Sequence, residues 1–262
     1  MPQDPVIEIK DVSGLSNILL LDVRDKSAFD ADHAEGAVRV PVELWVDAAK
    51  NSETSFADVG FWQQQIRDLG VKAKSSAIVF DDGRLTEAAR VWFILQYFGA
   101  TTYVLNGGWD AVKGSRITNV ATQSGTQNPF IAKPGTGKVG LIEREALRDE
   151  IGNGAVIFDA RTQAEFDGLD LKNNARGGHL PGALLLSHSE LLDGKRLKAA
   201  ATLHRLIDHT GFQPGDHIVT HCDGGGRAAL AAVAAVRAGY PGVRVYYLSF
   251  ADWAKDESCP IV

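Results

Sequence analysis

Short runs of apolar residues alternate along this chain with longer segments of helical periodicity. Runs such as "ILLLD", "AIVF", "AVIFD" and "HIVT" are bounded by polar segments, which is typical of the buried strands of a parallel sheet. Between them lie mostly apolar segments such as "TEAARVWFILQYFGA" and "RAALAAVAAVRAGYP", which end near Gly99 and Gly239, as helices often do. The pattern predicts an α/β fold in which right-handed crossovers place helices on both faces of mostly parallel sheets.

The same pattern occurs twice. The segment "ILLLDVRDKSAFDADHAEGAVRVPVE" has a later counterpart in "AVIFDARTQAEFDGLDLKNNARGGHLPGALLLSHSE". Each copy has a strand ending in Asp-x-Arg, then a phenylalanine, a histidine and a Gly-Ala turn. The matched residues are Asp22 and Asp159, Arg24 and Arg161, His33 and His179, and Ala37 and Ala183. The distance from the Asp to the Ala is 15 positions in the first copy and 24 in the second, so the second copy carries a nine-residue insertion around "GLDLKNNAR".

We therefore predict two domains of one fold, at residues 1–115 and 138–262. The intervening residues 116–137 are rich in Gly, Ser, Thr, Asn and Pro and lack sustained periodicity, which is typical of a linker. The duplication describes the fold and says nothing about the chemistry.

Composition excludes several classes of partner. The net charge of −6 argues against nucleic acid and anionic membranes, and no apolar run is long enough to span a bilayer. The N-terminus shows no basic segment followed by an apolar one, so we expect no secretory signal and a cytoplasmic protein. The two cysteines, Cys222 and Cys259, are then expected to be free thiols in a reducing compartment.

Chemistry is concentrated in "HCDGGGRAAL", residues 221–230. Cys222 follows a predicted strand and precedes a predicted helix, a position where α/β folds bind ligands. Three glycines allow a tight loop whose amide N–H groups point inward, with the helix N-terminus behind them. Such a loop favours an anion and would hold Cys222 as the nucleophilic thiolate. Aligning "AIVFDDGRL" with "HIVTHCDGG" places Asp82 over Cys222, so only the second copy is expected to be catalytic.

The whole chain resembles the tandem-domain rhodanese family of thiosulfate and 3-mercaptopyruvate sulfurtransferases. The resemblance is carried by "LLDVRDKSAF", "RVWFILQYFGATTYVLNGGW", "IFDARTQAEFDG", "RGGHLPGA", "HCDGGGRAAL" and "SFADWAKDESCPIV". It implies two rhodanese-like domains, a first domain without a catalytic cysteine, and a persulfide formed on Cys222. It also implies a substrate and persulfide-binding loop made of Asp223, Gly224, Gly225, Gly226 and Arg227.

The same resemblance implies a small anionic sulfur donor, a cyanide or thiol acceptor, and no metal or organic cofactor. It does not identify the donor. Asp223 stands where thiosulfate-using members have basic residues in the loop and mercaptopyruvate-using members a small residue. Glu165 lies where many long members place a substrate-binding arginine, and the nearest basic substitute is Arg176, a possible substrate-binding residue.

Other polar residues have structural interpretations that we favour. Arg227 is expected to pair with Glu165, and Arg161 with an acid of its own copy. His221 is interpreted as a packing residue rather than a general base. Turn-stabilising hydrogen bonds are expected for His33 and His179, a loop-structuring role for Asp82, and no resolving role for Cys259.

Two alternative functions stay open. A cysteine-dependent phosphatase also uses His-Cys, a loop of amides and an arginine, but its signature has five residues between cysteine and arginine, whereas four separate Cys222 from Arg227. A non-enzymatic persulfide carrier or binding module would keep the thiol without turning over an acceptor.

Overall fold

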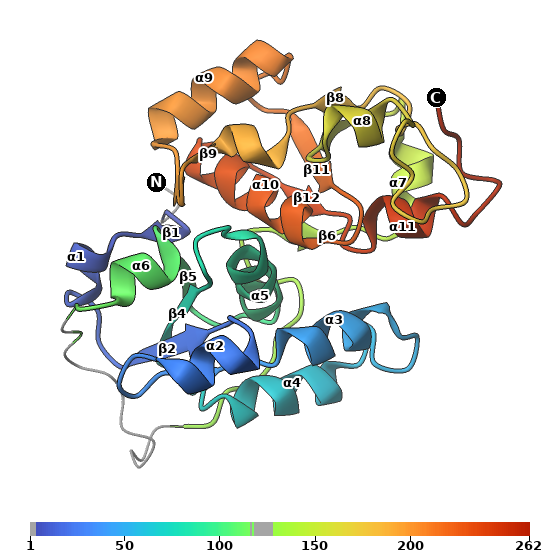
Figure 1. Cartoon of the computed structure of the whole chain (residues 1–262). Helices are drawn as coiled ribbons and strands as arrows, with labels where there is room; N and C mark the ends of the chain where they lie inside the picture. Colours follow the sequence, from blue (N-terminus) through green and yellow to red (C-terminus); the bar gives the residue numbers. More distant parts are fainter. Residues whose placement is uncertain (1–3, 116, 118–127) are drawn as a thin grey trace. The chain divides into compact units, whose positions relative to one another are not determined.

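The computed structural model describes residues 4–115, 117 and 128–262. The chain forms two compact units, one made of Pro5–Gly137 and the other of Lys138–Val262 together with Asp4 (Figure 1). Of the predicted linker, residues 116 and 118–127 lie outside the described residues. Its last part belongs to the first unit, because Pro129 bridges to Lys72 and the Lys133 N–H donates to the Phe98 carbonyl.

The first unit is a parallel sheet in the order β1-β5-β4-β2-β3. Its strands are β1 (Val6–Ile7), β2 (Ile18–Asp22), β3 (Val38–Arg39), β4 (Ser76–Phe80) and β5 (Thr102–Leu105). Its helices are α1 (Ile9–Val12), α2 (Lys26–Ala31), α3 (Val42–Lys50), α4 (Val59–Asp68), α5 (Thr86–Tyr97) and α6 (Gly108–Val112).

The second unit repeats this order as β6-β12-β11-β7-β8, again parallel. Its main strands are β6 (Gly140–Leu141), β7 (Ala155–Asp159), β8 (Leu184–Leu185), β11 (His217–His221) and β12 (Arg244–Val245), and β9 (Leu192–Asp193) pairs antiparallel with β10 (Arg196–Leu197). Its helices are α7 (Arg144–Glu150), α8 (Gln163–Phe166), the 3-10 helix η1 (His188–Leu191), α9 (Ala200–Thr210), α10 (Gly226–Arg237) and α11 (Ser249–Trp253). The predicted fold class is confirmed.

Both faces of each sheet are covered. In the first unit, alternate residues of β2 and β4 pack with Val12 of α1 and Val112 of α6, while Trp62 of α4 and Phe93 of α5 belong to a separate aromatic cluster around Phe56. In the second unit the cluster on one face contains residues of α7 and α11, and α10 packs between β11 and α9. Each central strand is therefore buried on both sides, which explains its continuous apolar sequence.

Within the described part of the chain, no helix combines the length and the apolar character needed to cross a bilayer.

Gly108, at the start of α6, allows a close approach of two loops. Its φ is +56°, and a Cβ there would lie 2.6 Å from both the Asp81 carbonyl oxygen and the Gly83 nitrogen. We expect Gly108→Ala to lower the free energy of unfolding by about 3 kcal/mol, through strain plus steric clash. The matched control is Gly114→Ala, where φ is +79° and nothing lies within 4 Å of the added Cβ, so only about 1 kcal/mol is expected. Urea unfolding followed by tryptophan fluorescence measures both; equal losses would contradict the steric explanation.

Candidate active site

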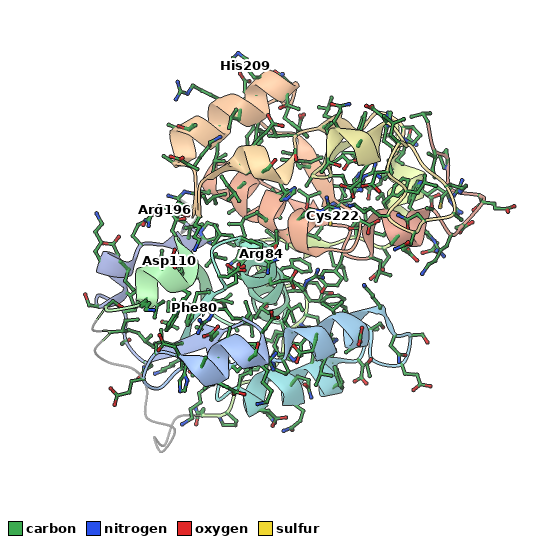
Figure 2. The ribbon with its side chains drawn as sticks, viewed as in Figure 1. Phe80, Arg84, Asp110, Arg196, His209 and Cys222 are labelled. Atoms are coloured by element: carbon green, nitrogen blue, oxygen red, sulfur yellow. The ribbon has the colours of Figure 1, made fainter. Side chains whose placement is uncertain are left out.

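Cys222 begins the loop that leaves the central strand of the second sheet. β11 pairs with β7 on one side and β12 on the other, so the position of Cys222 is fixed by two parallel ladders. Its thiol is buried, with only 1% of the residue exposed. The Cys222 N–H donates to Ser249 Oγ at 3.1 Å, and the Gly225 N–H donates to Cys222 Sγ at the same distance. The loop thus turns back on the sulfur, and Figure 2 marks the place of Cys222 in the second unit.

Two further features favour negative charge on this sulfur. Gly225 has a φ of +98° and α10 begins at the next residue, so the N-terminus of a long buried helix stands behind the loop. The Ser249 hydroxyl lies 3.8 Å from Sγ and can donate to it or to the Tyr246 carbonyl at 2.9 Å. Ser249 was not identified from the sequence as a residue of the site, because it lies 27 positions after Cys222. The one feature of the sequence that could have identified it is its alignment with Gly108 of the first copy.

Arg227 and Glu165 form the predicted pair, which is confirmed. The two guanidinium nitrogens of Arg227 donate to the two carboxylate oxygens of Glu165 at 2.6 and 2.7 Å. Glu165 also closes a capping box with Thr162 at the start of α8. Burial by itself would raise the pKa of Glu165, but the bonds from Arg227 and Thr162 lower it to about 2. Arg227 therefore braces the loop, and its planar fork is occupied by a carboxylate.

The inserted segment of the second copy holds the residue after the cysteine. Asn174 Nδ2 donates to Asp223 Oδ1 at 2.7 Å, and the Ala251 N–H donates to the Asp223 carbonyl. Two consecutive non-glycine residues just before Asn174, Lys172 and Asn173, have φ values of +47° and +70°. The insertion thus adopts a strained local conformation where it meets the Cys222 loop.

Arg176 has contacts that favour a structural role over the expected substrate contact. Its guanidinium donates to the carbonyl oxygens of Trp253, Ala254, Asp256 and Cys259. Four of its five N–H groups are therefore used in joining the insertion to the segment that follows α11.

The paired Asp-x-Arg motifs form the same structure in both copies. Arg161 donates to both carboxylate oxygens of Asp159 and lies 4.0 Å above the Phe250 ring. Its counterpart Arg24 does the same with Asp22 and lies 3.8 Å above Trp109. The expected ion pair of each arginine with an acid of its own copy is confirmed.

The two turn histidines are also as expected. Nδ1 of His33 is 2.9 Å from the Phe29 carbonyl oxygen, and Nδ1 of His179 is 3.0 Å from that of Phe166. Each ring stacks on the phenylalanine whose carbonyl it contacts. Since one pair lies in the copy without a thiol, these contacts support the turn and not the chemistry.

The strand register corrects one alignment made from the sequence. Asp22 is opposite Phe80, and Asp159 is opposite His221. Phe80 is therefore the counterpart of His221, and Asp81, not Asp82, is the counterpart of Cys222. The Asp82 carboxylate instead accepts from the Arg84 N–H and side chain, as a loop-structuring acid does. The alignment failed because the loop of the first copy is one residue longer.

Asp81 occupies the first copy's version of the same loop. Its carboxylate accepts from the N–H groups of Gly83, Leu85 and Ala88. Leu85, with a φ of +62° just before α5, corresponds to Gly225 just before α10. Burial raises the pKa of Asp81, and these N–H groups partly oppose the rise. The loop of this fold therefore binds an anionic atom group at the position of the Cys222 sulfur.

A hollow of about 440 Å³ lies beside Asp81, lined in part by Ala28 and Glu87. Ala28 takes the place of Glu165 when the chain is aligned at Asp22 and Asp159, and Glu87 takes that of Arg227 when the starts of α5 and α10 are aligned. The ion pair of the second copy thus occupies space that is open in the first.

Cys259 is a buried thiol within a hydrophobic cluster of the second unit. Burial raises the pKa of Cys259, and the charge of Asp256 adds to the rise. Both effects disfavour a thiolate, so Cys259 lacks the features that activate a nucleophile.

Comparison with known proteins agrees with this geometry. The model of the rhodanese-like domain matches residues 7–115 and again residues 143–256. The chain belongs to the rhodanese-like family. It carries two such domains in tandem, and the thiol of the strand-to-helix loop is present in the second.

Its curated relatives match over most of their length. A thiosulfate sulfurtransferase of Corynebacterium glutamicum is 28% identical and aligns over 90% of this chain and 82% of its own. A 3-mercaptopyruvate sulfurtransferase of Escherichia coli is 26% identical over 87% and 83%. Among solved structures, the anaerobic ergothioneine biosynthesis enzyme of Chlorobium limicola covers 98% of this chain with a TM-score of 0.79, at 17% identity, and 70% of that enzyme is covered. That likeness describes the fold.

The Glu165–Arg227 pair predicts an acid-dependent stability. Because the folded-state pKa of Glu165 is about 2, below its ordinary value of 4.5, its contribution is present above pH 4.5 and is lost as the pH falls towards 2. We expect Glu165→Gln to lower Tm at pH 7, because Arg227 keeps a buried charge without its partner. The variant should also lose less stability than the wild type between pH 4.5 and 2. Calorimetry across this range is the measurement, and parallel pH profiles would refute the assignment.

Proposed function

We propose that this protein is a sulfurtransferase that moves a sulfane sulfur from thiosulfate or 3-mercaptopyruvate to a cyanide or thiol acceptor through a Cys222 persulfide. The observation that carries the proposal is the anion-binding loop that both copies share. In the first copy a carboxylate fills it, and in the second the sulfur of Cys222 takes that place, with the Gly225 N–H 3.1 Å away. The names of the relatives support the same chemistry.

In the proposed reaction the Cys222 thiolate attacks the outer sulfur of the donor. A new S–S bond forms on Cys222, and the donor's bond to that sulfur breaks. Sulfite leaves with the electron pair when the donor is thiosulfate. When the donor is 3-mercaptopyruvate, the electron pair of the broken C–S bond leaves with the enolate of pyruvate, which then takes a proton. The acceptor then attacks the terminal sulfur, and Cys222 departs as thiolate. The sequence of two displacements predicts ping-pong kinetics and needs no metal or organic cofactor.

The residues around the sulfur have separate roles in this proposal. The N–H groups of residues 223–227 stabilise the negative terminal sulfur, in the manner of an oxyanion hole. The Ser249 hydroxyl, 3.8 Å from Sγ, is a further donor for the persulfide. Arg227 holds the loop through Glu165. The cytoplasmic setting stays a prediction from the sequence.

The phosphatase alternative is less well supported. A phosphoryl group presents three equatorial oxygens and is usually held by a bidentate arginine. The fork of Arg227 is bound to Glu165 at 2.6 and 2.7 Å. Hydrolysis of p-nitrophenyl phosphate that depends on Cys222 would favour this alternative over sulfur transfer. A carrier without enzyme activity would accept sulfur but fail to turn over with excess acceptor.

Cys222→Ala should abolish sulfur transfer, because no other described thiol has an activating environment. Cys259→Ala should keep wild-type activity, since Cys259 is buried and its pKa is raised. Intact mass spectrometry after thiosulfate or 3-mercaptopyruvate should show the mass of one added sulfur atom in the wild type and in Cys259→Ala, and none in Cys222→Ala. A sulfur adduct retained by Cys222→Ala would refute the assignment of the nucleophile.

Asp223 should make thiosulfate a weak donor. Its carboxylate bonds to the neutral amide of Asn174, which leaves the negative charge uncompensated by that contact. A carboxylate about 6 Å from a bound anion repels it by roughly 1–3 kcal/mol at an effective dielectric near 20. We expect Asp223→Asn to raise kcat/KM for thiosulfate about tenfold at low salt and less at high salt.

The control for this prediction is Asn174→Ala, which removes the hydrogen bond and keeps the charge. It should not raise kcat/KM for thiosulfate. If the two variants behave alike, the position of the loop rather than the charge of Asp223 sets the preference for the donor.

A further inference from the structure

His221 and Cys222 both differ from their counterparts at the end of β4. The strand register places Phe80 at the corresponding position of the first copy. The histidine and the thiol therefore occur together, while the Asp-x-Arg pair beside them is present in both copies. A residue needed only for packing could have been a phenylalanine in both.

Each ring nitrogen of His221 faces an atom that only accepts hydrogen bonds. Nδ1 is 3.2 Å from the Cys222 carbonyl oxygen. Nε2 is 3.3 Å from Asp159 Oδ2, and both side chains are fully buried. This is an ion-pair distance without hydrogen-bond geometry, since Nε2 has no hydrogen-bond partner among the described residues. A bare lone pair on Nε2 would be repelled by the carboxylate at this distance, whereas a positive ring is attracted to it and still donates from Nδ1 to the carbonyl. The short distances therefore favour the cationic ring.

The ring lies near ion pairs that are each neutral. From β7, the Asp159 carboxylate is bound by Arg161. From β12, Tyr246 keeps its proton, because burial and the bond to Asp252 raise its pKa, and Asp252 of α11 pairs with Arg144 of α7. The pair of Arg227 and Glu165 is likewise neutral. An imidazolium at His221 therefore offsets negative charge on the Cys222 sulfur and on the adjacent Asp223 carboxylate, which is bound by the neutral amide of Asn174.

The first copy shows the contrasting arrangement. Its ion pair of Asp22 and Arg24 is also neutral, but Phe80 brings no positive charge. The anion of that loop, Asp81, has its pKa raised by burial. The cation near this loop is Arg84, which pairs with the exposed carboxylate of Asp82, so the first copy has no buried cation at the position of His221.

We propose that His221 is a positioning residue for sulfur transfer, and that its imidazolium, bridging Asp159 and the Cys222 carbonyl, holds the loop in its sulfur-binding conformation and favours the Cys222 thiolate. This role deepens the proposed function and rests on Cys222 being the reactive thiol. His221 does not touch the donor; it acts through the backbone and charge of Cys222.

The test uses the full chain with Cys259→Ala, so that Cys222 is the one thiol that can be alkylated. The variants are His221→Phe, the residue that the first copy carries, and His221→Asn, which can donate to the Cys222 carbonyl without a charge. His217→Gln is the control, since His217 begins the same strand and is exposed. Iodoacetamide alkylation of Cys222 is followed by mass spectrometry from pH 5 to pH 10, and sulfur transfer is measured in parallel.

Loss of the nearby positive charge should move the pH of half-maximal alkylation upward by about one unit or more in both His221 variants. His221→Phe should reduce sulfur transfer at pH 7 at least tenfold, and His221→Asn should recover part of the transfer but not the alkylation profile. His217→Gln should match the wild type. Unchanged alkylation profiles in both His221 variants would overturn the proposal. If His221→Phe does not fold, the profile of His221→Asn decides.

A direct measurement complements the variants. Long-range ¹H–¹⁵N NMR of the wild type at pH 7 should report both ring nitrogens of His221 as protonated, and a neutral ring would overturn the proposal. Alkylation and NMR need no sulfur donor, so they separate this role from the proposed function. If no donor transfers sulfur to the wild type while the histidine effect is present, the proposed function fails and the role of His221 stands.

Discussion

The turn from a buried strand into a buried helix leaves backbone N–H groups at the helix start with no partner in the helix itself. In this protein the side chain at the turn is buried in both copies, with Asp81 4% and Cys222 1% exposed, and this side chain accepts from the N–H groups. The first copy uses the carboxylate of Asp81 and the second the sulfur of Cys222. Most of the other polar contacts near the second turn keep that sulfur and those N–H groups together.

Three separate segments hold the loop of the second copy. The start of α8 contributes Glu165, which binds Arg227 from one side. The insertion contributes Asn174, which binds Asp223. The first residue of α11, Ser249, accepts from the Cys222 N–H. Because these partners come from different parts of the sequence, the loop depends on the whole domain being folded.

Much of this arrangement could be predicted from the sequence, and the reasons for the failures are physical. The duplicated Asp-x-Arg motifs, the turn histidines and the pair of Arg227 with Glu165 follow from local patterns and from charge. The match of Asp82 to Cys222 was wrong, since two consecutive aspartates hide a difference of one residue in loop length. The bond from Asn174 to Asp223 spans 49 positions, and no periodicity reports a contact at that distance. Arg176 was read as free to bind substrate because a sequence does not show the backbone carbonyls that surround a guanidinium.

The loop lengths of the two copies also constrain how they can interconvert. The N–H group that meets the anion comes from Leu85, four positions after Asp81, but from Gly225, three positions after Cys222. Asp81→Cys alone would therefore place a thiol in a loop whose length suits a carboxylate. Cys222→Asp alone would place a carboxylate in a loop that is one residue too short for it. Converting the loop of one copy into that of the other therefore requires a substitution and also the insertion or deletion of one residue. A loop that has undergone only one of these two changes would be poorly formed. Gene conversion between the halves would have to exchange the whole turn, and point mutation is a slow route for moving the nucleophile from one domain to the other.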